Sequence, residues 1–557
     1  LEAQNAGNFQ LSLDIPQDVS LELQASDLAQ FHTKLGGTGS LTVANYAGEN
    51  ISGLETNQTT PASLSQLQSL TLKVAANTSV NLADDALLPV LTSQTGDVTN
   101  KVKVELGANA NLTYLEPVSG ATTALANREI ALASGATFAV QADLADQFSY
   151  AAGTAIATNS TIQLIGFDGS ETITKVNATS AKLHAVVGQP SNGAGAGATE
   201  TVSISEADKL GPIDILSVAA GSSLTLTSAF ATLPSSLSFG QISGSLTATA
   251  SQLSGKAIPS TIPSAVALGS SLGAITVKTV DDATDLSGVN TAYQLTAELT
   301  TDNANNLNFA KTYFSTVDRF VITTSGTFTA TAAELDGRTV VAATGVTATV
   351  NVTGYTNQDL SNVSEAFTLN VTTDPGASLV AAKLATADTI SVKGVNALSA
   401  ADGQALVATL APADMNAELR ITDATAPASA LNALNAKSTV VVSAVNIGRI
   451  TGSSAEVNAV YTASEGSFSN LNAPAITLNT DPSLAQLKAI NLGTNGVITL
   501  PSYDKPLTGS AADVVDALSG SFAAAYTGTV TLNTTAAVAQ ANAISGATSG
   551  VVTATIS

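Results

Sequence analysis

The chain has 557 residues with 43 acidic and 20 basic side chains, which give a net charge of −23. It contains no cysteine and only two histidines. This composition excludes disulfides, thiolate metal sites and nearly all histidine-based acid–base chemistry. The negative charge disfavours nucleic acid and anionic membranes as partners and favours divalent cations as counterions. Charged residues make up 11% of the chain, well below the roughly 25% of ordinary domains, which is typical of a secreted or surface structural protein.

No apolar run approaches the roughly 18 residues that a membrane-spanning helix needs. We therefore expect no transmembrane segment. The chain begins at Leu1 without methionine or a basic leader, and we expect a processed form or a fragment.

Residues 1–192 are predicted to be rich in β-strands. Apolar and polar residues alternate in Phe9–Ile15, Leu70–Val74 and Val102–Leu106, the period of a half-buried strand. Turn residues interrupt these runs at short intervals. The pattern fits either a sandwich or an irregular solenoid, and periodicity does not choose between them.

A glycine- and alanine-rich stretch at 193–200 is predicted to be a linker. Residues 201–398 then contain degenerate β-rich repeats. Ser245–Lys256 aligns without gaps to Thr327–Arg338, 82 residues later.

Residues 399–557 repeat a longer unit. The tetrapeptides that begin at Ser399, Ser453 and Ser510 recur at offsets of 54 and 57 residues. Strand-like runs begin near 389, 418, 439, 475, 496, 528 and 550, and segments with helical spacing lie between them, as in Leu484–Ile490. Such a unit buries its apolar face only by stacking on the next copy.

The predicted fold is therefore mainly β with short helices. It is multidomain and elongated, with a β-rich N-terminal part followed by strand/short-helix repeats in a solenoid-like or layered rod. The last copy is incomplete, and its final strand would be an exposed edge. We expect either further sequence or a docking surface there.

Acidic residues recur three positions after serine in each copy, as Asp402, Glu456 and Asp513. Serine at an N-cap and an acidic or amide side chain at the third helical position form a capping box. Thr331 with Glu334 and Thr249 with Gln252 repeat the spacing, and the glutamine indicates that charge is not essential. We interpret these residues as helix caps rather than as a row of catalytic or calcium-binding carboxylates.

Two acidic clusters are the candidates for a calcium site, Asp84 with Asp85 and the group Asp281, Asp282 and Asp285. Calcium takes several oxygen ligands from closely spaced carboxylates and carbonyls. Neither cluster matches an EF-hand loop, and a solvated acidic turn is the simpler interpretation of each.

No catalytic or cofactor-binding residue is assigned from the sequence. His32 and His184 lie far apart without acidic neighbours, so we interpret both as ordinary surface or packed histidines. The glycine-rich run Leu35–Ser40 lacks the lysine of a phosphate-binding loop and is interpreted as a turn.

Three stretches, Leu484–Asn491, Leu507–Val515 and Tyr526–Leu532, resemble repeats in giant cell-surface proteins of cyanobacteria, including surface-layer and motility-associated proteins. The resemblance is clearest over 399–557, fainter over 245–398 and not evident before 200. It implies an exported, non-enzymatic surface protein and supplies no catalytic motif.

The expected function is a structural protein of the cell exterior that self-assembles into a surface layer, sheath or filament. The expected partners are further copies of the chain, as an oligomer or polymer, and cell-surface polysaccharide; calcium is a possible cofactor. The alternative is an adhesin or phage-type fibre that binds glycans or surfaces. A polysaccharide-active enzyme needs carboxylates that converge in a groove, and the charge-poor repeats offer few of them.

Overall fold

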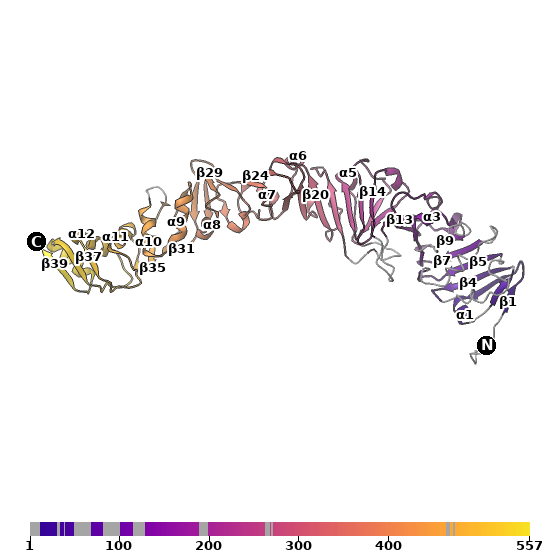
Figure 1. The fold of residues 1–557 in the computed structure, drawn as a ribbon, viewed down its shortest axis with the longest axis horizontal. Coiled ribbons are helices and arrows are strands. Elements are labelled where there is room, and N and C mark those ends of the chain that lie inside the picture. Colours follow the sequence, from indigo (N-terminus) through magenta and orange to yellow (C-terminus); the bar gives the residue numbers. More distant parts are fainter. Residues whose placement is uncertain are drawn as a thin grey trace. The chain divides into compact units, whose positions relative to one another are not determined.

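The computed structural model describes residues 12–30, 34–37, 39–49, 68–81, 101–114, 128–188, 199–261, 268, 271–463, 468–471 and 474–557. The chain divides into two compact units. The first comprises Leu1–Glu298 and Thr312–Asp318, and the second comprises Leu299–Lys311 and Arg319–Ser557. The predicted linker at 193–200 lies almost wholly outside the described residues. Figure 1 colours the chain by residue number, and within each unit short strands lie side by side.

The first unit contains parallel sheets of short strands. One sheet has the order β11-β9-β7-β5-β4-β2, and another has the order β17-β15-β13-β12-β10-β8-β6. The strands of the six-stranded sheet are β2 (Ser20–Gln24), β4 (Ser40–Tyr46), β5 (Ser69–Val74), β7 (Lys101–Leu106), β9 (Arg128–Leu132) and β11 (Ser149–Tyr150). Those of the seven-stranded sheet are β6 (Ser79–Asn81), β8 (Asn111–Tyr114), β10 (Thr137–Gln141), β12 (Thr161–Ile165), β13 (Lys182–Val187), β15 (Ile215–Val218) and β17 (Ser238–Ile242).

Further strands of this unit form a small pair and a third parallel sheet. The pair is β1 (Ser12–Ile15) with β3 (Lys34–Gly37). The third sheet runs through β14 (Thr201–Ile204), β16 (Ser223–Leu226), β18 (Ser245–Thr249), β19 (Ala274–Lys278) and β20 (Gln294–Leu299). The helices are single turns: α1 (Ala25–Gln30), α3 (Ala142–Ala145), α4 (Thr174–Asn177), α5 (Ala250–Leu253), and the 3₁₀ turns η4 (Gly153–Ala155), η5 (Ala207–Leu210) and η6 (Thr312–Phe314).

The second unit is built in the same way from parallel strands. Beside the pair β21 (Arg319–Ile322) and β23 (Thr339–Ala342), one sheet has the order β22-β24-β25-β27-β29, with β22 (Gly326–Thr331), β24 (Ala348–Tyr355), β25 (Thr368–Thr373), β27 (Thr389–Val392) and β29 (Leu410–Pro412). Another has the order β26-β28-β30-β32-β34, with β26 (Ser378–Leu379), β28 (Val395–Leu398), β30 (Glu418–Ile421), β32 (Val441–Ser443) and β34 (Phe468–Ser469).

Two smaller sheets complete the second unit. They have the orders β31-β33-β35-β36 and β37-β38-β39. Their strands are β31 (Thr425–Pro427), β33 (Arg449–Gly452), β35 (Ala475–Leu478), β36 (Ile498–Thr499), β37 (Leu507–Gly509), β38 (Val530–Ala536) and β39 (Val552–Ile556).

The helices of the second unit lengthen along the chain. The shorter ones are α6 (Thr301–Asn305), α7 (Ala332–Leu335) and η7 (Ala381–Leu384). The longer ones are α8 (Ala400–Leu406), α9 (Ala428–Lys437), α10 (Ser454–Thr462), α11 (Leu484–Gly493), α12 (Ala511–Leu518) and α13 (Val538–Ala547), and each of these packs against the next. Among the described residues, no helix has the length and apolar character needed to cross a membrane.

Along parts of the chain, consecutive strands alternate between two sheets, whereas elsewhere, as at β12 and β13, consecutive strands pair within one sheet. In the first unit the order β6 to β10 along the chain assigns strands alternately to the seven-stranded and the six-stranded sheet. The parallel register then places like residues on top of one another: Leu112 pairs with Phe138, Phe138 with Ile162 and Ile162 with Leu183, and all four are buried. The apolar core is this stacked column between the sheets.

The expectation of a β-rich chain with short helices is confirmed. The strand starts predicted near 389, 418 and 475 are those of β27, β30 and β35. The repeat of 54 to 57 residues, however, contains two strand-and-helix turns rather than one: α8 and α9 fall in the first copy, α10 and α11 in the second, and α12 and α13 in the third. The sequence repeat is therefore a pair of structural repeats.

A cluster of phenylalanines fills the core where the second unit begins along the chain. The rings of Phe309 and Phe320 lie edge to face at 5.0 Å, and those of Phe328 and Phe367 at 6.3 Å. Phe328 has 0% exposure. Because aromatic rings in this geometry bury a large apolar area, the cluster anchors the first turns of the unit.

We predict that Phe328→Ala destabilises the second unit by about 3–5 kcal/mol, because it removes a fully buried ring and leaves a cavity. Denaturant unfolding followed by tyrosine fluorescence measures the change. Thr329→Ala on the exposed face of the same strand is the matched control, with an expected change within about 0.5 kcal/mol. Equal effects of the two variants would contradict the placement of this core.

Candidate functional site

The serines that precede the recurring acidic positions are helix N-caps, as predicted, but the full capping box forms at Glu456 and not at Asp402 or Asp513. The hydroxyl oxygens of Ser399, Ser453 and Ser510 each accept a hydrogen bond from the backbone N–H three residues later, at 3.0, 3.2 and 3.1 Å respectively. These serines precede α8, α10 and α12 and have extended backbones. Each hydroxyl satisfies one of the N–H groups that a helix start leaves without an intrahelical acceptor.

Side-chain length decides whether the capping box closes. Glu456 reaches back to the backbone N–H of Ser453 at 2.8 Å, and Gln252 does the same to Thr249 at 2.9 Å. The hydrogen bonds from Ser453 hold the pKa of Glu456 below its usual value. Aspartate is one methylene shorter, and the carboxylates of Asp402 and Asp513 instead accept the serine hydroxyl. Because glutamine makes the same bond as glutamate, the role of the position is capping.

A second set of caps connects successive turns of the chain. The first backbone N–H of α8, that of Ala400, donates to the carboxylate of Asp423 at 2.5 Å. The equivalent N–H groups of α10 and α12 donate to Thr480 and Thr534 at 2.9 and 3.1 Å. The acceptors lie 23, 26 and 23 residues further along the chain. Each helix start is therefore capped by its own serine and by a side chain of the next turn.

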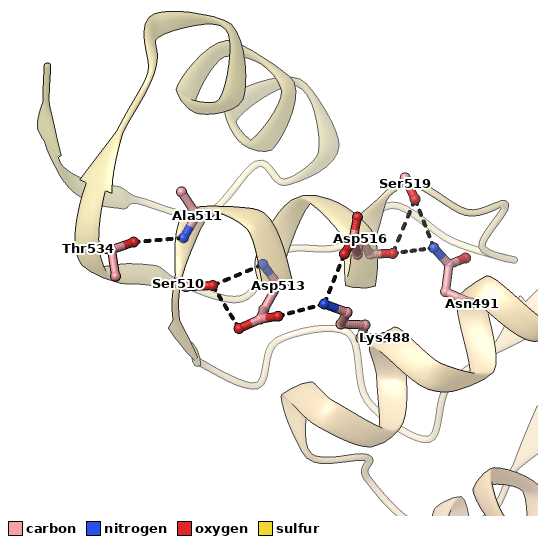
Figure 2. A network of polar contacts seen from close by, with 8 residues as sticks. All are labelled: Lys488, Asn491, Ser510, Ala511, Asp513, Asp516, Ser519 and Thr534. Carbon is pink, nitrogen blue, oxygen red and sulfur yellow. Dashed lines mark hydrogen bonds and ion pairs between the residues drawn. The ribbon is translucent and has the colours of Figure 1, made fainter. Parts of the chain in front are cut away.

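The densest polar network joins α11 to α12 (Figure 2). The ammonium group of Lys488 lies 2.6 Å from Asp513 and 2.9 Å from Asp516. Both carboxylates raise the pKa of Lys488, chiefly through hydrogen bonds. Nearby, the buried amide of Asn491 donates to the carbonyl of Asp516 and, at 2.9 Å, to the hydroxyl of Ser519. The exposed ion pairs contribute little to stability, whereas the Asn491 bonds are shielded from water.

A shallow groove of about 580 Å³ lies beside this network. Its walls include Leu484, Lys488, Leu492, Asp513 and Asn533. Two charged residues of its lining, Lys488 and Asp513, are paired with each other, and the hydroxyl of Ser510 donates to Asp513. The groove offers a mixed polar and apolar surface for contact.

The calcium candidates have separate outcomes. Asp84 and Asp85 lie outside the described residues. Asp281 and Asp285 each use one carboxylate oxygen to close a local turn, through Thr284 at 2.7 Å and Ser287 at 2.6 Å. The bond from Ser287 lowers the pKa of Asp285. Within the part of the chain that the structure describes, no group of three histidine, cysteine, aspartate or glutamate side chains is arranged to hold a metal. Calcium binding stays a prediction, for Asp282 as for the other four.

An aspartate immediately before a strand is a recurring feature that our sequence analysis missed. Asp214 accepts the N–H of Leu183 at 2.8 Å and returns its own N–H to the Leu183 carbonyl at 2.9 Å. Asp318 makes the same pair of bonds with Leu295, and Asp388 with Leu369. The sequence signal is an aspartate that follows an apolar-x-x-apolar pattern, as in 210–214, 314–318 and 384–388.

Of the two histidines, His32 lies outside the described residues and His184 is packed inside the first unit. His184 is 1% exposed and shares a hydrogen bond of 2.9 Å with the hydroxyl of Ser217. Burial lowers its pKa to about 4. Its ring stacks in the parallel ladder beside Gln163, so the interpretation as a packed histidine is confirmed.

A pocket of about 660 Å³ lies near the turn between β11 and η4, with Tyr150, Ile156, Lys175 and Thr179 in its walls. The hydroxyl of Tyr150 donates to the carbonyl of Ala145 at 2.8 Å, and burial raises the pKa of this phenol. Tyr150 is therefore held as a structural donor and is not poised to ionise.

Comparison with protein-family models finds no match to this chain, and comparison with curated proteins finds no significant match.

We predict that Ser453→Ala destabilises the second unit by about 1 kcal/mol, because it removes the N-cap of α10. Glu456→Gln keeps the capping geometry and should change stability by less than about 0.5 kcal/mol. Both are measured by urea unfolding. If Glu456→Gln were as destabilising as Ser453→Ala, the position would need its charge and the capping interpretation would be wrong.

We predict that His184 makes the free energy of unfolding depend on pH. The pKa of His184 is about 4 in the folded chain against an ordinary 6.5. The free energy of unfolding is therefore unaffected by His184 above pH 6.5, and it decreases as the pH falls from 6.5 to 4, because the unfolded chain then binds a proton that the folded chain does not. The loss is about 3 kcal/mol, since one pKa unit corresponds to about 1.4 kcal/mol. Urea unfolding of wild type and His184→Gln across this range isolates the effect, because the carboxylates are common to both. Parallel pH curves would contradict it.

Proposed function

We propose that the chain is a non-enzymatic structural protein of the cell exterior that self-assembles into a surface layer, sheath or filament. The observation that carries the proposal is the last described turn of the second unit. There, β39 ends its sheet, and Val538, Val551 and Ile556 are 57%, 71% and 49% exposed. An apolar end with an unpaired strand edge favours association.

The proposal includes a solenoid architecture for each unit. Parallel pairing, alternation of consecutive strands between two sheets and helices that pack in sequence all support it. In a solenoid, each turn buries its apolar face only against its neighbours. A further turn with a similar apolar face would then pack against the outermost turn.

The end turn has the strand and helix of the inner turns but fewer buried residues. In α11 the residues Leu487 and Ile490 are buried, whereas only Ile544 is buried in α13. The strand β38 buries Val530 and Leu532, but no residue of β39 is buried. The last described turn therefore leaves apolar positions exposed, and we propose that a further turn of the same kind covers them, from a second copy of this chain or from sequence beyond Ser557.

The resemblance to giant cyanobacterial surface proteins and the low charge content support an extracellular, cell-surface location. Cell-surface polysaccharide and calcium remain proposed partners. The negative charge of −23 makes screening by divalent cations a plausible requirement for close packing of copies.

We predict that the purified chain forms lattices or filaments visible by electron microscopy, more readily with calcium than with a chelator. Ala554→Pro should reduce this assembly. The N–H of Val530 donates to the Val551 carbonyl and that of Ser557 to the Ala536 carbonyl; since strand N–H groups alternate in direction, the N–H of Ala554 points away from β38. Proline there removes a donor from the free edge without breaking the existing pairing.

Ala554→Ser keeps the N–H and is the matched control, expected to assemble like wild type. If Ala554→Pro assembles like wild type, the free edge of β39 is not the contact between copies. Stable monomers under all conditions would contradict self-assembly, and glycan binding by those monomers would favour the adhesin or phage-type fibre.

A further inference from the structure

The first unit contains a buried cation that the proposed function does not use. Arg128 is the first residue of β9 and is 2% exposed. Tyr114, the last residue of β8, is also 2% exposed. β9 belongs to the six-stranded sheet and β8 to the seven-stranded sheet. The pair therefore lies in the core, with one residue contributed by each sheet.

The surroundings of this pair are apolar. The ring of Phe148 packs edge to face on Tyr114 at 5.6 Å and on Phe138 at 5.3 Å. Val102, the register partner of Arg128 on β7, is buried as well. Burial lowers the pKa of Arg128 to about 10, so the guanidinium remains charged at neutral pH.

Three polar atoms of this pair are buried without a hydrogen-bond partner. They are the Nε and Nη1 atoms of Arg128 and the hydroxyl of Tyr114. The neighbouring Lys103 shows the contrast, because its ammonium lies 2.9 Å from Glu105 and 3.8 Å from Glu129 on the partly exposed face of the sheet. An unpaired charge buried in the core costs several kcal/mol, and each unsatisfied donor adds to the penalty.

We propose that Arg128 and Tyr114 form an internal binding site for a small monovalent anion, a halide or a short carboxylate. The site supplies one full positive charge and donors from two residues, which is what such an anion needs to leave water. A single negative charge neutralises the guanidinium. A monovalent ion fits better than phosphate or sulfate, because a second negative charge would stay uncompensated in the core.

A bound anion would connect the two sheets, since it would accept hydrogen bonds from Arg128 of β9 and Tyr114 of β8. The site also couples anion binding to folding, because the arrangement exists only in the folded chain. A ligand bound only by the native state raises the unfolding temperature steadily with the logarithm of its concentration above Kd.

The experiment measures the unfolding temperature of the full chain by calorimetry at constant ionic strength. Sodium gluconate, whose anion is larger than chloride or acetate, is replaced stepwise by sodium chloride or sodium acetate. For wild type, the transition of the first unit should rise with each tenfold increase in chloride or acetate. For Arg128→Met, which fills a similar volume without charge, the same transition should not respond.

Lys103→Met is the matched control, because it removes one cation of the same sheet from the partly exposed face and should keep the wild-type anion response. An equal response in wild type and Arg128→Met would overturn the proposal, since it would report general salt effects. Absence of any response in wild type would overturn it too.

A second measurement does not depend on the folding of the variant. The chloride NMR signal should broaden in the presence of the wild-type protein, and acetate should reverse the broadening by displacing chloride. Lys103→Met should broaden the signal to the same extent as wild type. If chloride is not broadened by the wild-type chain, or if acetate leaves the broadening unchanged, the internal site is excluded.

Discussion

Parallel pairing of each strand with its counterpart one turn later is the interaction on which the rest of the structure depends. The pairing places Leu112, Phe138, Ile162 and Leu183 in one buried column, so backbone hydrogen bonds and apolar burial are formed by the same contact. Parallel strands need a crossover of a dozen or more residues between them, and the crossovers here carry the other strand and the short helices.

Side chains at the corners keep this stack in register. Where a strand begins, Asp214 exchanges two hydrogen bonds with Leu183 of the preceding turn. Where a helix begins, Thr534 accepts the first N–H of the preceding helix at Ala511. Both devices bond backbone groups that regular structure leaves open. They also explain why a chain with so few charges places aspartate at these positions, because the carboxylate accepts hydrogen bonds from backbone N–H groups.

The sequence predicted strands, helices and caps well because each depends on local pattern. Alternation in Val102–Leu106 and the spacing of Leu487 and Ile490 identified elements that the structure contains. The pairing of distant strands was not readable, because alternation is the same in parallel and antiparallel sheets. The true structural repeat was hidden as well, since two turns with different helices, such as α10 and α11, form one sequence repeat. The Arg128 and Tyr114 pair gave no signal, because its residues come from two sheets and meet only through the fold.

The contrast between inner and outer turns connects architecture to function. An inner turn has both faces covered, whereas β39 and α13 leave the positions of Val538 and Val551 in water. A globular domain can close over its own core, but a stacked array cannot, because each added turn recreates the same apolar face. Within the described residues β39 carries no proline and no charged side chain, two of the features that protect natural edge strands from pairing.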